Sequence, residues 1–160
     1  MTCSWTNEYP PHVPKTINPD RYQSVLDIYQ ETLNSYSDSP AFQNMGRVHT
    51  YRMLDHYSTL LAAYLQSECS LEKGGRVAIM MPNLLQYPIS IIGVFKAGGT
   101  IVNVNPLYTP RELHHQLKDS QAQTIIVLET FCHVLEKALE GTQVQNIIVC
   151  KIGDMLGGLK

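Results

Sequence analysis

The side chains best suited by type to do chemistry are the histidines and the acid between positions 114 and 119. His114 and His115 are adjacent, and Asp119 follows four residues after His115. A histidine close to a carboxylate can act as a general base. On a helix the two histidines point about 100° apart, so they do not share a metal ion, and only His115 and Asp119 lie on one face. A solvated helix surface is the favoured interpretation of this segment.

Other residues with chemical potential lack partners at the required spacing. The four cysteines form no CxxC pair, which zinc sites usually contain, so reduced and mostly buried thiols are expected. His49, His56 and His133 have no carboxylate or cysteine at ligand spacing. Gly74-Gly75 precedes an apolar run, which is the wrong order for a strand-loop-helix phosphate site. No residue of this chain is predicted to be catalytic, to bind a cofactor or to hold a metal.

The composition is that of an ordinary globular protein. The 160 residues are 44% hydrophobic and 16% charged, with a net charge of -2. There is no basic run to neutralise phosphates, so no nucleic-acid partner is expected. The apolar runs are far shorter than the roughly 20 residues of a membrane span, and residues 1–14 lack the basic and apolar regions of a secretory signal. A cytoplasmic location is therefore predicted.

The elements that must position these side chains are organised around the segment from Met80 to Leu117. Short apolar runs closed by proline, at 76–81 and 100–104, are typical of buried strands. Between them, Asn83 is expected to cap a helix that ends at Gly98-Gly99. A helix between two such strands favours parallel pairing. The apolar positions of this helix are Leu84, Tyr87, Ile91, Val94 and Phe95.

The next helix has the clearest start signal in the chain. Thr109 is an N-cap residue, Pro110 suits the first helical position, and Glu112 can complete a capping box. The helix is therefore predicted to begin at Pro110. Its buried stripe is predicted to hold Leu113 and Leu117, and its solvent side His114, Gln116 and Lys118.

The C-terminal third continues the alternation of strands and helices. Apolar runs at 124–128 and 146–150 flank a helix expected over 131–140 and stopped by Gly141. Continuous apolar strands that alternate with helices predict a parallel sheet covered on both faces. Residues 151–160 show no periodic pattern and are expected to form a ragged end.

The N-terminal part is predicted to contain an arm and one helix. Residues 1–20 hold four prolines and are expected to be extended, with Trp5 and Tyr9 available to anchor the arm to a surface. Ser24 then starts an amphipathic helix that ends in the polar run 34–40. The apolar side of this helix holds Val25, Ile28, Tyr29 and Leu33.

A hairpin and a long helix are expected to follow. Asn44-Met45-Gly46 is predicted to be a three-residue turn with Gly46 at positive φ. Thr50 is expected to cap a helix that runs to about Glu68. Met53 stands where a capping box needs Glu or Gln, so this cap is only half built. The buried face of the helix is predicted to hold Leu54, Tyr57, Leu61 and Leu65.

The segment from residue 80 to 122 closely resembles the early part of long-chain fatty acid:CoA ligases, which belong to the adenylate-forming enzyme superfamily. The resemblance rests on PNLLQYP at 82–88, KAG at 96–98, VNVNPLYTPREL at 102–113, INPDRYQS at 17–24 and AFQNMG at 41–46. It implies an α/β fold, the N-terminal part of the large domain, with a mostly parallel sheet flanked by helices. The implied division is an arm over 1–20, an α/β subdomain of an incomplete AMP-binding domain over 21–150, and the ragged end over 151–160.

The resemblance also implies a function for a complete enzyme. Such a ligase activates a fatty acid with ATP and Mg2+ to an acyl-adenylate and then transfers the acyl group to CoA. The family's motifs for ATP and Mg2+ lie beyond the end of this chain. The chain alone is therefore expected to bind none of these cofactors and to be inactive. Peripheral association with the inner membrane face and a homodimer through the N-terminal arm are also implied.

Two other hypotheses stay open. One is a stand-alone, non-catalytic binding or interaction module derived from such an enzyme. The other is an acyltransferase that uses His114 and Asp119. The apolar runs at 124–128 and 146–150 contain no charged residue. A chain cut after Lys160 would leave an apolar edge strand uncovered and prone to aggregation, which favours the ligase fragment.

Overall fold

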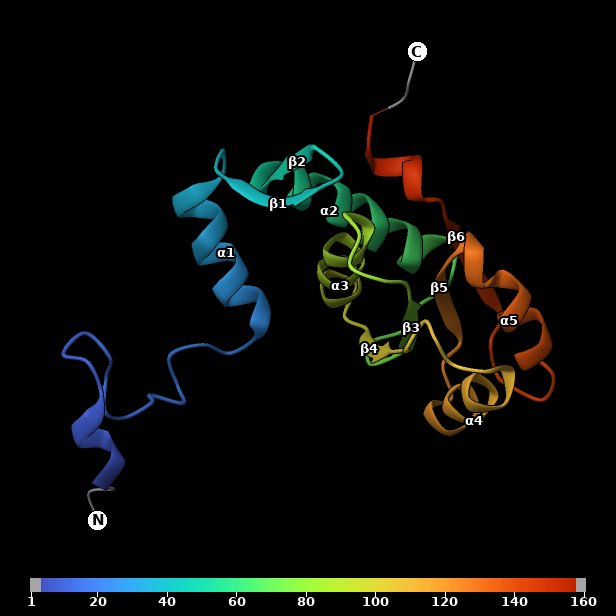
Figure 1. Cartoon of the computed structure of the whole chain (residues 1–160), viewed down its shortest axis with the longest axis horizontal. Coiled ribbons are helices and arrows are strands. Elements are labelled where there is room, and N and C mark those ends of the chain that lie inside the picture. The colour runs from blue at the N-terminus through green and yellow to red at the C-terminus, as the bar shows by residue number, and fades with distance from the viewer. Residues whose placement is uncertain (1–3, 158–160) are drawn as a thin grey trace.

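The computed structural model describes residues 4–157 and consists of an α/β body and an N-terminal arm that extends away from it (Figure 1). At the centre of the body is a four-stranded sheet in the order β4-β3-β5-β6, in which all neighbours are parallel. This confirms the predicted parallel sheet. The strands are β3 (Arg76–Met80), β4 (Thr100–Asn103), β5 (Thr124–Leu128) and β6 (Asn146–Cys150).

Helices cover both faces of this sheet, as predicted. Val77 and Ile79 of β3 pack with α2 (Tyr51–Ser67) and α3 (Gln86–Lys96). The alternate residues Ala78 and Met80 pack with α4 (Pro110–Ser120) and α5 (Cys132–Ala138). Side chains of a strand point alternately to its two faces, so one short strand contributes to two separate cores. Each large apolar side chain buried this way contributes about 1.5–3 kcal/mol.

The predicted start of α3 is wrong, whereas its predicted end is confirmed. The helix begins at Gln86, and Leu85 at the N-cap makes no side-chain bond. Leu85 is buried in the core, so the chain first turns at Pro82, where the Leu84 N–H donates to the Pro82 carbonyl at 2.8 Å. At the other end Gly98 has φ 79° and the Gly99 N–H donates to the Val94 carbonyl at 2.9 Å, a Schellman motif.

The contact between α2 and α3 depends on small side chains that the apolar pattern did not identify. The α2 face buries Leu54 and Leu65 as predicted, but Tyr57 and Leu61 are only half-buried. A Cβ built on Gly93 of α3 would lie 2.8 Å from Leu61 Cδ2, so the two helices approach closely at this glycine. The other small or polar side chains buried on these helices are Ser58, Ala62, Gln86 and Ser90.

The hairpin turn is shorter than predicted. Strands β1 (Pro40–Asn44) and β2 (Arg47–Thr50) pair antiparallel, and Asn44 lies opposite Arg47. The loop therefore has two residues, Met45 and Gly46, with φ 47° and 78°. Two successive positive φ values are the mark of a type I′ turn, whose twist matches that of the strands. Thr50 caps α2 by accepting from the Met53 N–H at 3.2 Å, which is the predicted half-built cap.

The N-terminal elements are only loosely packed. Helix α1 (Val25–Tyr36) starts with the Ser24 capping box but extends into the expected polar run, and Tyr29 is its buried residue. On the predicted apolar side of this helix, Val25 and Ile28 are exposed. A short 3-10 helix, η1 (Ser4–Glu8), interrupts the arm that the prolines predict to be extended. One turn fits there because it ends before Pro10. Residues 1–3 of the predicted arm lie outside the described residues.

The C-terminal elements differ in detail from the prediction. Helix α4 begins at Pro110 with its capping box and buries Leu113 and Leu117, as predicted. Helix α5 is shorter than expected and follows a 3-10 turn, η2 (Glu129–Phe131). After β6 the chain forms another 3-10 helix, η3 (Ile152–Met155), where an irregular end is expected. We call residues 151–157 the C-terminal strap; residues 158–160 lie outside the described residues.

Candidate functional site

The strand order points to one edge of the sheet as the place for a ligand. β3 leads through α3 to β4 on one side, and β5 leads through α5 to β6 on the other. The connections that follow the adjacent strands β3 and β5 therefore lead to opposite edges of the sheet. Ligands of open α/β sheets bind outside the carboxyl ends of the strands at such a switch point. The candidate site consists of the loop after β3, residues 81–85, and the turn after β5, residues 129–131.

These two loops do not have the features of a phosphate site. Neither contains a glycine. In the first loop, the Leu84 N–H donates to the Pro82 carbonyl at 2.8 Å, and in the first turn of α3 the Tyr87 N–H donates to the Leu84 carbonyl at 3.1 Å. Phosphate cradles need such backbone donors to be free. Within residues 4–157 no group of three His, Cys, Asp or Glu side chains is placed to hold a metal ion. The two loops therefore differ from a glycine-rich phosphate cradle.

A second candidate region is an open depression of about 660 Å³ beside α4. Its lining brings His115 and Asp119 together, as their spacing predicts, and both are exposed. Glu112 lies in the same depression but is already used by the helix cap. The Thr109 N–H and hydroxyl donate to Glu112 Oε2 at 2.8 and 2.7 Å, and these hydrogen bonds lower the pKa of Glu112.

His114 does not join this depression. Its Nδ1 lies 3.1 Å from the carbonyl oxygen of Ala138, which can only accept, so this nitrogen donates to α5. Gln116 likewise turns inward, and its Nε2 donates to the Asn103 carbonyl at 2.9 Å. The predicted solvent exposure of both residues is therefore wrong, while Lys118 is exposed as predicted. The acyltransferase hypothesis is not supported, because the histidine that it needs, His114, is used in a hydrogen bond between α4 and α5.

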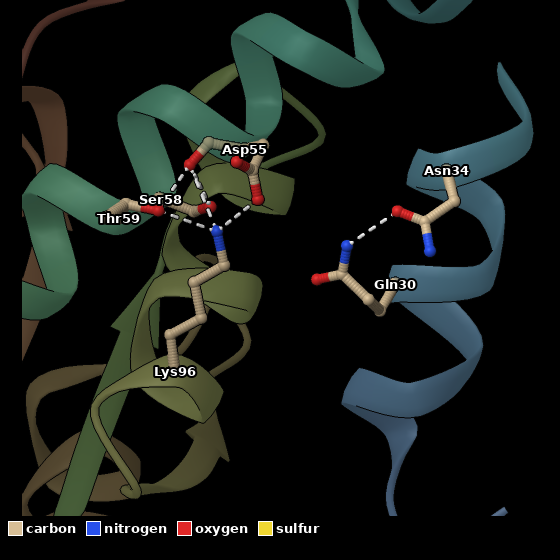
Figure 2. A network of polar contacts seen from close by, with 6 residues as sticks. All are labelled: Gln30, Asn34, Asp55, Ser58, Thr59 and Lys96. Atoms are coloured by element: carbon tan, nitrogen blue, oxygen red, sulfur yellow. Dashed lines mark hydrogen bonds and ion pairs between the residues drawn. The ribbon is translucent and has the colours of Figure 1, made fainter. Parts of the chain in front are cut away.

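A polar cluster that the sequence did not indicate joins α2 to α3 (Figure 2). The Lys96 ammonium donates to Asp55 Oδ1 at 2.6 Å, to the Asp55 carbonyl at 3.0 Å and to Thr59 Oγ1 at 2.8 Å. An ammonium has three protons, so this set satisfies it. The ring of Tyr29 lies 5.5 Å from the same nitrogen. The only related sequence feature is the spacing of Asp55 and Thr59, which stand one helical turn apart. That spacing alone does not indicate Lys96 as their partner.

The surroundings of this cluster keep its phenol neutral. Burial, with the nearby Asp55 carboxylate, raises the pKa of Tyr29 to about 12. Gln30 and Asn34 of α1, also drawn in Figure 2, hydrogen-bond to each other at 3.0 Å and lie apart from the Lys96 group. The cluster therefore holds α2 and α3 together, and its phenol is not ionised at neutral pH.

Two thiols of the described residues, those of Cys69 and Cys150, are poor nucleophiles. Cys69, Cys132 and Cys150 are free and half-buried. Burial raises the pKa of Cys150 to about 11 and also raises the pKa of Cys69. Because the thiolate is the reactive form, these two groups are protonated and unreactive at neutral pH. Cys3 lies outside the described residues.

Sequence comparison finds similar proteins along the whole chain. The family model described as AMP-binding enzyme matches residues 29–158. The chain is 53% identical over 160 residues to a long-chain-fatty-acid–CoA ligase of Escherichia coli O6:H1, and 54% identical to one of Salmonella typhimurium. A ligase of the same name from Bacillus subtilis is 35% identical over 152 residues. The chain spans 28% of the length of the first two relatives, at their N-terminal end.

Solved structures show the same fold. An anthranilate CoA ligase in complex with anthranoyl-AMP matches 91% of this chain with a TM-score of 0.76 at 20% identity, over 26% of its own length. A luciferase-like enzyme from Zophobas morio gives the same TM-score at 23% identity and also covers 91% of this chain, over 37% of its own length. At these identities the likeness concerns the fold, and it agrees with the predicted parallel sheet flanked by helices.

Proposed function

This chain belongs to the AMP-binding enzyme family, and from that premise we propose that it is the N-terminal segment of a long-chain fatty acid:CoA ligase. The observation that supports this most directly is identity of 53–54% over all 160 residues. It extends through residues 1–28, which the general family model does not match. The same matches give no support to the alternative of a stand-alone binding module.

In the proposed reaction a complete ligase converts a fatty acid and ATP to an acyl-adenylate, and then transfers the acyl group to CoA. ATP, Mg2+ and CoA are assigned to the complete enzyme, because the loops after β3 and β5 contain no glycine and no group of three metal-ligating side chains occurs within residues 4–157. The contribution of this segment is structural. It forms a parallel sheet with a buried apolar core on each face, and the rest of the large domain can pack against it.

A segment exchange tests this proposal. The N-terminal 28% of the Escherichia coli ligase is replaced by this chain, and acyl-CoA formation from a long-chain fatty acid, ATP and CoA is measured. We expect the hybrid to keep activity within about tenfold of the parent, because half of the aligned residues are identical and core substitutions that conserve volume are tolerated. The 160-residue chain alone is expected to form no acyl-CoA.

The matched control is the same exchange with the Bacillus subtilis segment, which is 35% identical to this chain. A folded hybrid with this chain that forms no acyl-CoA, while the Bacillus subtilis hybrid does, would contradict the proposal. Acyl-CoA formation by the chain alone would contradict the assignment of the chemistry to later residues.

We also propose a cytoplasmic location, with peripheral association at the inner membrane face and a homodimer formed through the arm. No helix within residues 4–157 is long and apolar enough to cross a membrane. Trp5 is 63% exposed and Tyr9 is 40% exposed, so their rings are available for a contact. Light scattering checks the homodimer: the wild-type mass is expected to be that of two chains, and Trp5→Ala is expected to reduce it. A monomeric wild type would contradict the homodimer.

The division of the chain at residues 20 and 150 stays a prediction. Limited proteolysis checks it. Cleavage is expected first in the arm, before residue 21, because residues 4–8 bury no side chain and residues 9–21 are exposed.

A further inference from the structure

Strand β6 is an edge of the four-stranded sheet, and within residues 4–157 no strand pairs with its outer side. The backbone groups of successive residues point alternately to the two sides of a strand. The Asn146 N–H donates to the Gln123 carbonyl, beside β5, at 3.1 Å. The N–H and C=O groups of Ile147 and Val149 therefore point away from β5, to the open side. These groups are placed to pair with one more strand.

The opposite edge of the sheet, β4, is protected, whereas β6 is not. On β4 the Asn103 carbonyl accepts from Gln116 Nε2 of α4 at 2.9 Å, and Pro106 follows the strand. Natural sheets protect their edges with charged residues, proline or a bulge. Residues 146–150 contain no charge and no proline, and their pairing with β5 shows no shift in register. Strand β6 is therefore the edge at which this sheet can be extended.

An apolar hollow lies beside β6 on each face of the sheet. On the α5 side, Ile147 and Leu135 line a hollow of about 240 Å³. On the α2 side, Ile148 and Leu60 line one of about 220 Å³. Successive side chains of an added strand point alternately to the two faces, so they would be directed to these two hollows in turn. Ile147 and Val149 are 45% and 49% exposed and offer further apolar contacts.

The C-terminal strap does not pair with this edge. The Lys151 N–H donates to Asp154 Oδ2 at 2.7 Å, so the open backbone groups end with β6. Gln86 Nε2 of α3 donates to the Lys151 carbonyl at 2.7 Å. His49 Nε2 of β2 donates to the Met155 carbonyl at 3.2 Å, since a carbonyl can only accept. The strap is thus held by α3 and β2.

We propose that the outer edge of β6 is a docking site for an extended, uncharged peptide segment of a partner, which adds to the sheet as a fifth strand. Main-chain hydrogen bonds to Ile147 and Val149 position the segment, and its alternate apolar side chains enter the two hollows. The open backbone groups favour a peptide as the occupant, because a hydrocarbon leaves them unpaired. This inference does not depend on the proposed ligase function.

The features of β6 also narrow the kind of segment. An uncharged segment is favoured, because residues 146–150 carry no charge to pair with one. A second copy of this chain fits less well. Its own Ile147 and Ile148 already line the hollows of that copy, so they are not available to fill those of another.

NMR and hydrogen exchange of the 160-residue chain test the proposal. The probe is the acetylated and amidated peptide Ser-Thr-Val-Ile-Val-Thr-Ser. It is expected to shift the amide signals of Ile147 and Val149 saturably and to slow their hydrogen exchange at least about tenfold, because these N–H groups then donate within a ladder. Exchange at Ile101 of β4 should not change. No slowing at Ile147 and Val149, or equal slowing at Ile101, would overturn the proposal.

Two altered peptides test the chemistry of the segment. Proline in place of the central isoleucine removes a ladder donor, and this peptide is expected to bind at least about tenfold more weakly. Aspartate at the same place is expected to weaken binding at least about tenfold as well, because its charge finds no partner on β6. Equal binding of the proline peptide would contradict strand addition, and equal binding of the aspartate peptide would contradict an uncharged occupant.

Variants at Val149 supply a matched pair on the chain itself. Val149→Pro removes one outward N–H, keeps the bonds to β5, and is expected to weaken peptide binding at least about tenfold. Val149→Thr keeps the N–H and the β-branched shape and is expected to change binding less than about threefold. Should Val149→Pro fail to fold by circular dichroism, Val149→Lys places a charge at the same edge and is expected to weaken binding too. Wild-type affinity in a folded Val149→Pro or Val149→Lys would overturn the proposal.

A dilution series without peptide tests for a second copy as the occupant. The amide signals of Ile147 and Val149 are expected to be independent of protein concentration. If they shift and become protected as the chain is concentrated, and Val149→Pro prevents this, β6 pairs with a second copy and the proposal of a separate peptide partner is wrong.

Discussion

Helices α1 and α4 begin with the same local signal but pack in different surroundings. Each has a capping box, Ser24 with Asp27 in α1 and Thr109 with Glu112 in α4. The two helices have 12 and 11 residues. Yet α4 buries two leucines completely, whereas α1 buries one tyrosine and exposes Val25 and Ile28. A capping box fixes where a helix starts, but the sheet decides which helix becomes part of the core.

The largest expected difference between the two helices comes from removing an apolar side chain from each. Leu117→Ala in α4 leaves a cavity in a sealed core and is expected to lower the free energy of unfolding by about 2–5 kcal/mol. Val25→Ala in α1 is expected to change it by less than about 0.5 kcal/mol, since Val25 is 56% exposed. Urea denaturation measures both, and equal losses would show that α1 is packed as tightly as α4.

The polar cluster beside α1 should have a smaller effect. Lys96→Met removes the ammonium that ties α3 to Asp55 of α2, in a pair whose side chains are 19% and 35% exposed. Loss of these charge-assisted bonds is expected to cost about 1–3 kcal/mol. The control is Arg52→Met, which breaks the exposed pair with Asp38 and is expected to produce no measurable change. If the two variants unfold at the same urea concentration, the cluster does not hold the helices together.

Removing the N-cap side chain from each capping box compares how α1 and α4 are coupled to the rest of the fold. Thr109→Ala is expected to lower global stability by about 0.5–2 kcal/mol, because α4 unfolds together with the core. Ser24→Ala should instead accelerate hydrogen exchange only within α1, as a loosely packed helix opens locally. Hydrogen exchange of both variants distinguishes these outcomes. Faster exchange throughout the sheet in Ser24→Ala would show that α1 is part of the same cooperative unit.

The smallest expected effect is a pH dependence at the start of α4. Hydrogen bonds from Thr109 lower the pKa of Glu112 in the folded state. The folded chain therefore binds fewer protons than the unfolded chain, and the resulting stability is present above the unfolded pKa. It is lost as pH falls through the lowered pKa. Urea denaturation between pH 6 and pH 3 is expected to show a shallower decline for Glu112→Gln than for wild type. An identical decline would exclude this contribution.

Much of the fold was predictable because its signals are local. The strands at 124–128 and 146–150 are uninterrupted apolar runs, and the start of α4 depends on residues within four positions of one another. The start of α3 was not predictable in this way. Asn83 has the right side chain for a cap, but burial of Leu85 is worth more than one capping bond.

The candidate site was less predictable than the fold. The spacing of His115 and Asp119 places them in one depression, as expected from a helix. That His114 donates to Ala138, and that Lys96 meets Asp55, depends on segments 24 and 41 positions apart. The absence of catalytic and ligand-binding residues from this chain stays a prediction.

The sequence by itself determined the succession of strands and helices along the chain and the main caps, because periodicity and capping act within one or two turns. It also determined the family, through its motifs. The tertiary structure alone decided that β5 lies beside β3 and not beside β4. That choice brings the loops after β3 and β5 to one switch point. It also lets Gln86 and His49 hold a strap that lies 65 and 106 positions away. Contacts at such separations depend on which apolar faces pack together, and a local pattern does not encode that choice.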